Sequence, residues 1–424
     1  MNVIKNLIND VDIPKFYKVI NHMDASHIED IPLAVHRALE RKGTLDRIRP
    51  GSKVCFTAAS REIANSVAIL RTFAEELKRI GCTPCIVPGM GSHGGATAQG
   101  QRDVLTHFGI TEEACGCEIH SSMETVAIGV TPEGLEVRLD AFALSCDYIV
   151  PIARIKPHTD FHGPFESGIM KMLSIGLGNQ YGASICHARG FSLMHVNVPA
   201  FGRVALQNAN IPFAIGLVEN AYHQTCVIRA IPNECVEVEE PELLLLAKSL
   251  MPSIPFQKVN VLILEQIGKD ISGDGMDPNI VGRTYNHREK PFIDRIGVLD
   301  LSPKTGSNFH GIGNADITTR RILEKGSFDE TYPNGITSQL VEYSRIPAVM
   351  DSDKACLQAC LKTCPDLGEA KKVIWAKDTL HMDTFFASES LLDEIHANPA
   401  LTTDGKVYAL AFDTNDNYTG FDPI

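Results

Sequence analysis

The sequence lacks the long apolar runs that membrane proteins need. No run approaches the roughly 20 residues required to span a bilayer, so we expect no membrane segment. The opening stretch, MNVIKNLIND, lacks the apolar core of a signal peptide, so we expect a cytoplasmic protein. An excess of positive charge is also absent, because the formal net charge is -13 at pH 7. We therefore expect no nucleic-acid partner, since phosphate backbones require a basic face.

Common nucleotide and metal motifs are missing as well. The turn GMGSHGG at residues 89–95 has neither the Gly-Lys-Ser/Thr of a phosphate loop nor the GxGxxG order of a dinucleotide fingerprint. No HxH or HExxH signals a conventional zinc site. The acidic loop at residues 270–279 lacks the spacing of a calcium-binding EF-hand, so we expect a structural or substrate loop there.

Cysteine is plentiful, with 12 residues, but its pattern does not indicate disulfides. Without an export signal, these side chains are expected to be thiols in a reducing compartment. The CxxC of Cys82 and Cys85 follows a predicted helix and enters a strand, whereas a redox CxxC follows a strand, so a redox role is the lesser alternative. Cys356, Cys360 and Cys364 share one helix face, which favours buried core thiols over a metal site.

A length of 424 residues exceeds one typical hydrophobic core and predicts two domains. Two separate strand–helix rhythms indicate that both are α/β, and the Pro-rich stretch at 251–255 reads as the linker. We therefore predict an N-terminal α/β domain over residues 1–255 and a C-terminal α/β domain over residues 256–424.

The first rhythm predicts strands at 53–58 and 83–88, followed by helices at 63–80 and 97–108. Such a repeat implies parallel strands with right-handed crossovers. Arg61 follows the first strand and the Ser92-His93 pair follows the second. We therefore expect these side chains on the same edge of one sheet. In the C-terminal domain, we predict a helix over residues 317–325.

The stretch from Pro151 to Gly190 carries most of the chemistry. It begins at the end of an apolar strand, where open α/β sheets place their ligands, and its six glycines allow close approach of backbone to a bound group. We expect this histidine-rich, glycine-rich loop to be a functional site, since burying so many titratable groups without function is costly. Its titratable residues are Lys156, His158, Asp160, His162, Glu166, Lys171 and His187.

An ordered set of motifs across both predicted domains resembles the lactate racemase family, the nickel-pincer enzymes that invert or epimerise 2-hydroxy acids. The matching elements are Arg61 at a strand end, Gly91-Ser-His93, Pro157-His158, the run from Ser167 and Gly168 to Lys171, His187, and the pair Gln266 and Lys269. The chain departs from the lactate-specific members at Gly94, which follows His93, at Ile175-Gly176, and in a longer segment between His158 and Lys171. The resemblance therefore implies a 2-hydroxy acid substrate but does not single out lactate.

The resemblance also implies a cofactor and a mechanism. A nickel-pincer nucleotide of the pyridinium bisthiocarboxylate type would be attached to Lys171, near Ser167 and Gly168, with His187 as the protein's metal ligand; imidazole suits nickel. The hydrogen of an unactivated carbinol is too weakly acidic for a side-chain base, so the implied reaction would proceed by reversible hydride transfer to the cofactor. Cofactor-maturation proteins of the host would be partners.

The substrate contacts implied by the resemblance come from both domains. His93 and His158 would be the two opposed acid/base groups, a role that suits the pKa of histidine. Arg61, Gln266 and Lys269 would hold the carboxylate and the developing alkoxide. The cofactor and substrate site is accordingly expected in a cleft between the two domains.

Two other classes of protein remain open. One is a nickel- or cofactor-binding protein without catalysis, which would need Lys171 and His187 but not the His93 and His158 pair. The other is a metal-dependent hydrolase with two or more protein ligands. Zinc by elemental analysis, without a chromophore, would favour the hydrolase.

Overall fold

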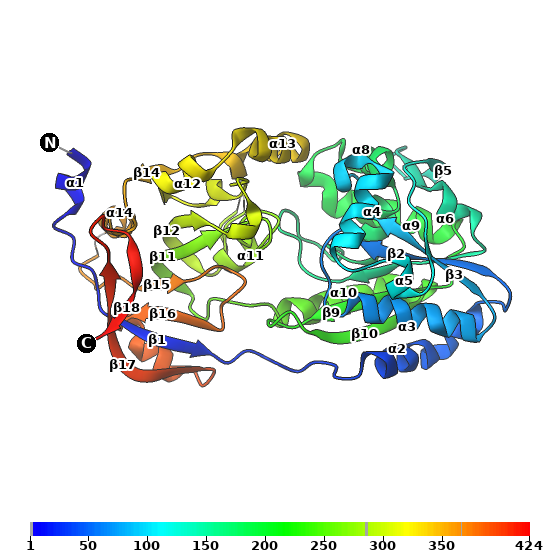
Figure 1. The fold of residues 1–424 in the computed structure, drawn as a ribbon, viewed down its shortest axis with the longest axis horizontal. Coiled ribbons are helices and arrows are strands. Elements are labelled where there is room, and N and C mark those ends of the chain that lie inside the picture. The colour runs from blue at the N-terminus through cyan, green and yellow to red at the C-terminus, as the bar shows by residue number, and fades with distance from the viewer. Residues whose placement is uncertain (1–2, 285–286, 366) are drawn as a thin grey trace. The chain divides into compact units, whose positions relative to one another are not determined.

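A computed structural model describes residues 3–284, 287–365 and 367–424 (Figure 1). The chain divides into two compact units, a central unit of Asp24–Met251 and a terminal unit of Met1–Met23 with Pro252–Ile424. Both mix helices with sheets, so the α/β fold class is confirmed. The division differs from the predicted one in the first 23 residues, which belong with the C-terminal part of the chain.

One strand explains that difference. β1 (Phe16–Asn21) pairs antiparallel with β16 (Thr384–Ser388) on one side and β17 (Leu401–Phe412) on the other. Phe16 and Val19 of this strand are fully buried in that unit. The pairing joins residues far apart in the sequence, so no local pattern could indicate it.

The central unit contains a four-stranded parallel sheet in the order β4-β3-β2-β7. The middle of β2 is buried throughout, as expected for a parallel strand with helices on both faces. A second sheet has the strand order β10-β9-β8. Its strand β8 begins directly after Pro151, which separates it from β7 of the first sheet. The strands of this unit are β2 (Lys53–Ala59), β3 (Thr83–Gly89), β4 (Glu118–Ile119), β5 (Thr125–Val130), β6 (Glu136–Asp140), β7 (Tyr148–Val150), β8 (Ile152–Arg154), β9 (Phe213–Glu219) and β10 (Thr225–Pro232).

Helices of the central unit follow the predicted rhythm, and β5 and β6 form an antiparallel hairpin. The α-helices are α2 (Ile31–Glu40), α3 (Ser66–Arg79), α4 (Ala98–His107), α5 (Glu112–Cys115), α6 (Ala141–Ser145), α7 (Ile169–Lys171), α8 (Asn179–His187), α9 (Met194–Asn208) and α10 (Val236–Ser249). The expected loop from Pro151 to Gly190 is therefore helical over much of its second half. Buried apolar side chains such as Met170, Leu173 and Cys186 pack this half into the core, which favours helix over loop.

The terminal unit is built on a nine-stranded mixed sheet in the order β14-β13-β12-β11-β15-β16-β1-β17-β18. The first five strands in that order are parallel and the remaining pairings are antiparallel. Besides β1, β16 and β17, its strands are β11 (Lys258–Ile267), β12 (Phe292–Leu301), β13 (Ile317–Thr319), β14 (Ala348–Met350), β15 (Val373–Ala376) and β18 (Tyr418–Pro423).

The terminal unit also contains six α-helices among its described residues. They are α1 (Val3–Ile8), α11 (Pro278–Val281), α12 (Arg320–Lys325), α13 (Phe328–Ser338), α14 (Asp353–Thr363) and α15 (Leu392–Ala397). Of these, α12 and α14 pack against the parallel strands β12 and β13. The predicted helix over residues 317–325 was wrong in its first turn, because β13 precedes α12. The Thr318 and Thr319 hydroxyls donate to the carbonyls of Val298 and Leu299, which holds this β-branched stretch extended beside β12.

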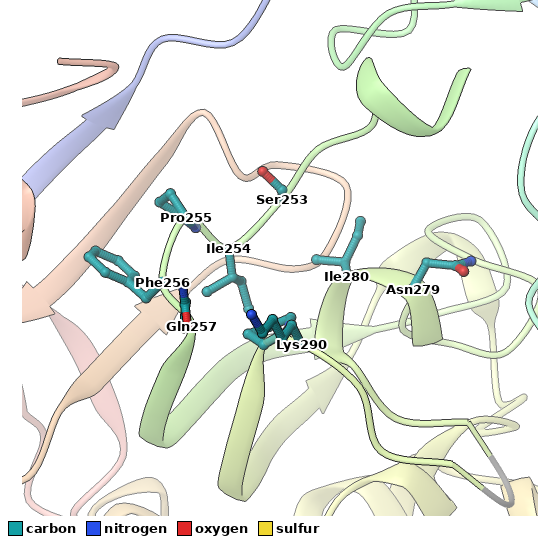
Figure 2. A pocket seen from close by; sticks show the side chains of 9 residues that line it. Ser253, Ile254, Pro255, Phe256, Gln257, Asn279, Ile280 and Lys290 are labelled. Carbon is teal, nitrogen blue, oxygen red and sulfur yellow. The ribbon is translucent and has the colours of Figure 1, made fainter. Parts of the chain in front are cut away.

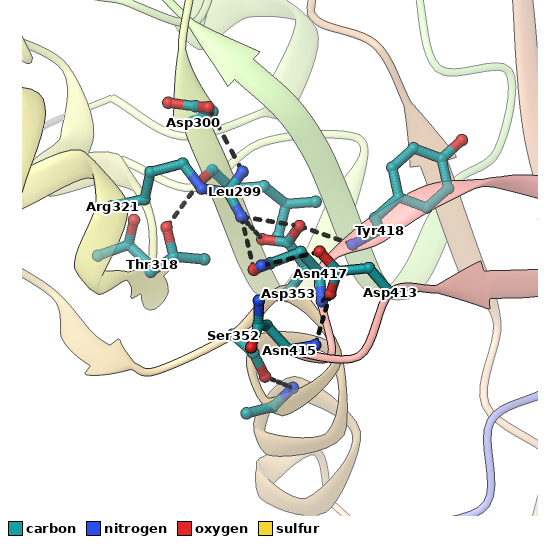
Figure 3. A network of polar contacts seen from close by, with 12 residues as sticks. Leu299, Asp300, Thr318, Arg321, Ser352, Asp353, Asp413, Asn415, Asn417 and Tyr418 are labelled. Atoms are coloured by element: carbon teal, nitrogen blue, oxygen red, sulfur yellow. Dashed lines mark hydrogen bonds and ion pairs between the residues drawn. The ribbon is translucent and has the colours of Figure 1, made fainter.

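A polar network fixes the turn between β17 and β18 to the helices of the terminal unit (Figure 3). The Arg321 guanidinium lies 2.9 and 3.0 Å from the two carboxylate oxygens of Asp353 and donates to the side chain of Asn417 at 2.9 Å. Asp353, the first residue of α14, also accepts from the backbone N–H of Tyr418 at 2.9 Å. Because Asp353 is buried and fully paired, we assign this network a structural role.

The cysteines behave as thiols, as predicted. Cys356, Cys360 and Cys364 are buried in the core of the terminal unit. Cys82 and Cys85 are also buried, and Cys85 lies within β3 rather than at a helix N-terminus. Within the part of the chain that the structure describes, no helix is both long and apolar enough to cross a membrane.

Candidate functional site

The predicted strand-end residues of the central unit gather on one sheet edge. β2 and β3 are parallel and in register up to Ala59 and Gly89, so Arg61 and His93 follow the carboxyl ends of adjacent strands, as predicted. On the other side of β2, the Thr57 hydroxyl donates to the carbonyl of Ile152 at 3.0 Å and accepts from its N–H at 2.8 Å. The sheet order β4-β3-β2-β7 shows that the chain continues from β2 to β3 and β4 on one side and later returns as β7 on the other side. Open α/β sheets bind ligands at such a reversal of strand order.

His158 lies in the loop after β8, beside the rings of Phe161 and Phe191 at centroid distances of 4.3 and 6.3 Å. Burial lowers the pKa of His158 well below its usual value, and the charges of Lys171 and Lys156 lower it further. The backbone N–H of Asp160 donates to Nδ1 of His158 at 3.0 Å. The neutral imidazole therefore carries its proton on Nε2.

Glu166 closes the loop that presents His158. Its carboxylate is 1% exposed and accepts from the backbone N–H of His158 at 2.7 Å and from that of Gly163 at 3.2 Å. His162 Nδ1 lies 3.3 Å away and Lys248 Nζ 2.6 Å away. Burial alone would raise the pKa of Glu166, but the bonds from His162 and Lys248 outweigh it and the pKa is lowered. Sequence reasoning noted the acid but missed this role, because Lys248 is distant in the chain.

Lys171 ends α7 and its side chain is partly buried. Burial lowers its pKa to about 8, with Lys156 and Arg61 adding to the effect and Asp160 opposing it. An amine with this pKa has a substantial unprotonated fraction near neutral pH, which a lysine needs in order to form a covalent bond. The charges of Arg61, Lys156 and Asp160 act on Lys171, so these three residues lie near its amine.

Glu240 supports the turn that precedes Lys171. Its carboxyl oxygens lie 3.3 and 3.1 Å from the backbone nitrogen of Met170, which donates to them. A side chain on Gly168 would begin 2.2 Å from Oε1 of Glu240, so it would have to displace this carboxyl group. Burial raises the pKa of Glu240 to about 8. Ser167 pairs through its backbone with Lys156, in both directions, at 3.0 and 3.2 Å. The structure thus explains Gly168 by packing, and its predicted contact with a cofactor stays a prediction.

His187 is the last residue of α8, on a helix rather than in the expected loop. Its Nδ1 donates to the backbone carbonyl of Ala183 at 2.7 Å, because a carbonyl can only accept. The neutral ring therefore carries its lone pair on Nε2. Burial lowers the pKa of His187, although the Ala183 carbonyl opposes this, and favours that neutral form. A neutral imidazole oriented through Nδ1 is the usual form of a histidine metal ligand.

Gln266 and Lys269 lie in the terminal unit, at and just after the end of β11. Gln266 Nε2 donates to Oδ2 of the buried Asp378 at 2.8 Å. Lys269 Nζ donates to the carbonyl of Gly273 at 2.6 Å, and its backbone N–H donates to the Thr305 hydroxyl at 3.0 Å. These two residues thus share one strand end. Their predicted meeting with the histidines of the central unit stays a prediction.

No cluster of three or more His, Cys, Asp or Glu residues that could hold a metal ion occurs among the described residues. A cavity of about 280 Å³ in the terminal unit contains none of the predicted site residues (Figure 2). It is lined by Ser253, Ile254, Pro255, Phe256, Gln257, Asn279, Ile280, Lys290 and Pro291. Lys290 is its one charged lining residue, and we assign the cavity no catalytic role.

Comparisons with known proteins show no family for this chain. No protein-family model matches the sequence, and no curated protein matches it. Among solved structures, the chain is similar to the lactate racemase apoprotein from Thermoanaerobacterium thermosaccharolyticum. The TM-score is 0.48 and the identity 16%, over 86% of this chain and 98% of that one. A likeness of this degree carries no conclusion about activity.

Proposed function

We propose that the protein is a racemase or epimerase of a 2-hydroxy acid that works with a nickel-pincer nucleotide. The observation that supports the proposal is that His158, Lys171 and His187 lie close together in the central unit, with both histidines beside Phe191. Their charges act on one another, since Lys171 lowers the pKa of both histidines. The motif resemblance assigns these residues to catalysis, cofactor attachment and metal binding.

The residues fit such a cofactor chemically. His187 is oriented by the Ala183 carbonyl so that Nε2 can coordinate a metal. Lys171 has the lowered pKa that a covalently attached amine requires. Lys156 places positive charge next to Lys171, which suits the phosphate of a mononucleotide. When bound, the cofactor would supply an electrophile that takes a hydride from the carbinol carbon and returns it.

His158 would exchange the proton of the substrate hydroxyl at Nε2, opposite His93. To accept a proton at Nε2, the ring must carry its own proton on Nδ1. The Asp160 carboxylate is suited to receive that Nδ1 proton in a hydrogen bond, since its Oδ2 lies 3.7 Å from Nδ1. Asp160 would therefore select the tautomer of His158. Its backbone N–H donates to Nδ1 when the ring proton is on Nε2, and its carboxylate would accept from Nδ1 when the ring proton is on Nδ1. Arg61 would hold the substrate carboxylate in a bidentate manner.

The test is a chirality screen of the protein co-produced with cofactor-making proteins. Single enantiomers of aliphatic and dicarboxylic 2-hydroxy acids would be incubated with this protein. The enantiomers present afterwards would be separated by chiral chromatography. We expect one class to be racemised, and Lys171→Ala to abolish both the cofactor and the reaction. Bound nickel without inversion of any acid would favour a cofactor-binding protein, and stoichiometric zinc without a chromophore would favour a hydrolase.

A further inference from the structure

Three buried thiols meet on one face of the parallel sheet of the central unit. Cys55 of β2 and Cys85 of β3 are register partners on adjacent parallel strands, so their side chains leave the same face of the sheet. Cys146 follows α6 and precedes β7, which pairs with β2 on its other side. All three belong to one hydrophobic core cluster, and we refer to them as the thiol cluster.

Cys146 lies between the other two thiols. Its Sγ is 4.0 Å from Sγ of Cys85, and a hydrogen bond with Cys146 is the largest cause that raises the pKa of Cys55. Each thiol also has a backbone carbonyl within reach, which is Ala143 at 3.7 Å for Cys55, Val54 at 3.7 Å for Cys85 and Phe142 at 3.5 Å for Cys146.

The surroundings favour a thiolate on Cys146 rather than on its neighbours. Hydrogen bonds from Cys55 and Cys85 lower the pKa of Cys146, and the charge of Lys53 lowers it further. Burial and the charge of Asp147 oppose this, but they are outweighed. The bond with Cys146 raises the pKa of Cys85 in turn, as it does that of Cys55. One sulfur therefore carries the negative charge, and two S–H groups stabilise it.

We propose that Cys146 is a site of reversible oxidation by hydroperoxides, with Cys85 as the resolving thiol. The Cys146 thiolate would attack one oxygen of hydrogen peroxide, so that the O–O bond breaks, hydroxide leaves and a sulfenic acid forms. Sγ of Cys85 would then attack the sulfenic sulfur, and its proton would leave with the departing oxygen as water. The peroxide is reduced by two electrons, and the two thiols are oxidised to one disulfide.

The geometry suits this order of events. Cys146 is 8% exposed, whereas Cys55 and Cys85 are 0% and 1% exposed, so a peroxide reaches Cys146 first. Cys85 is held between β2 and β4, so Cys146 has to approach it by about 2 Å to reach the length of an S–S bond. Cys82, the other member of the CxxC motif, instead contacts the carbonyl of Arg49 at 3.3 Å.

This site goes beyond the proposed function and does not rest on it, because it needs neither cofactor nor substrate. To test it, the full chain without cofactor is treated with increasing concentrations of hydrogen peroxide, blocked with iodoacetamide and digested with trypsin. Cleavage sites at Arg102 and Arg138 separate Cys85 from Cys146, so a disulfide joins two peptides that mass spectrometry detects. We expect this joined pair to form, and to disappear after treatment with dithiothreitol.

The terminal unit supplies a control within the same chain. Cys356 and Cys360 are also buried and hydrogen-bonded to each other, but burial raises the pKa of Cys360 and the charge of Asp316 raises it further. They should stay reduced at peroxide concentrations that join Cys85 to Cys146. Oxidation of Cys360 at the same concentrations, or conversion of Cys146 to a sulfinic acid without a disulfide, would overturn the proposal.

The pH dependence of alkylation tests Cys146 as the attacking sulfur. Cys226 is the matched control in the same unit, since it is more exposed and burial raises its pKa. Between pH 6 and 8, limited iodoacetamide should react with Cys226 about tenfold faster per pH unit, because its thiolate fraction rises by that factor. The rate at Cys146 should stay nearly constant, and a tenfold rise per pH unit there would remove Cys146 from this role.

Discussion

Glu240→Gln offers a quantitative test of how the turn before Lys171 is built. Glu240 is 1% exposed, and burial raises the pKa of its carboxyl from 4.5 to about 8. The folded chain therefore keeps this proton at pH values where the unfolded chain has released it. Between pH 4.5 and 8, the folded state loses stability as the pH rises, by about 1.4 kcal/mol per pH unit. Over the whole window the loss is on the order of 5 kcal/mol.

Glutamine has the shape of the protonated side chain but does not titrate in this range. Its carbonyl oxygen can still accept from the backbone N–H of Met170. We therefore expect the difference in unfolding free energy, Glu240→Gln minus wild type, to increase from pH 5.5 to 7.5 by roughly 3 kcal/mol. The absolute difference at one pH is less informative, because the new amide N–H groups also need partners.

The assay should follow the central unit alone, since two units need not unfold together. Hydrogen-exchange mass spectrometry in increasing urea, read from peptides within residues 24–251, gives that unit's unfolding free energy at each pH. Glu242→Gln, at an exposed position on the same helix, is the control and should show a difference that does not vary with pH. Parallel pH dependences for wild type and Glu240→Gln would refute the reasoning.

Four further outcomes are expected. Glu166→Gln should lower the stability of the central unit by about 2 kcal/mol in chemical denaturation, since it weakens charge-assisted bonds; because the folded pKa is lowered, this contribution is present above pH 4.5 and is lost as the pH falls through the folded pKa. Asp160→Asn should reduce kcat about tenfold or more with KM little changed, by steady-state kinetics, if its carboxylate holds the reacting tautomer of His158. His187→Ala should lose nickel by elemental analysis while circular dichroism stays that of the wild type; full nickel retention would exclude the assignment. His93→Ala and His158→Ala should each reduce turnover about 100- to 10,000-fold in both directions with cofactor still bound, and an unaffected rate in either variant would remove that histidine from the mechanism.

The parts of the fold that the sequence predicts are those with local signals. Parallel strands such as β2 and β3 read as apolar runs followed by amphipathic helices, so the shared edge of Arg61 and His93 follows from topology alone. The strand β1 was missed, because its partners β16 and β17 are more than 350 residues away and its own alternation is short. Glycine-rich composition likewise concealed the helix that ends at His187.

The candidate site shows the same division. Residues such as His158 and Lys171 stand out because titratable side chains crowd one strand end. Their supports do not, since Glu166 meets Lys248 and Glu240 meets Met170 only through tertiary packing across 82 and 70 positions of sequence. Asp378 was missed for the same reason, because its bond to Gln266 spans 112 positions. A carboxylate that orients a site residue from this distance has no sequence signature of its own.

The central claim is that the protein inverts the carbinol carbon of a 2-hydroxy acid. It is tested most directly with a single enantiomer that carries deuterium on that carbon, incubated with cofactor-loaded protein and analysed by chiral separation and mass spectrometry. We expect the opposite enantiomer to form, more slowly than from unlabelled substrate, and to retain most of its deuterium. Absence of the opposite enantiomer for every acid tried would contradict the claim, and inversion with loss of the label to water would show that the carbon is deprotonated instead.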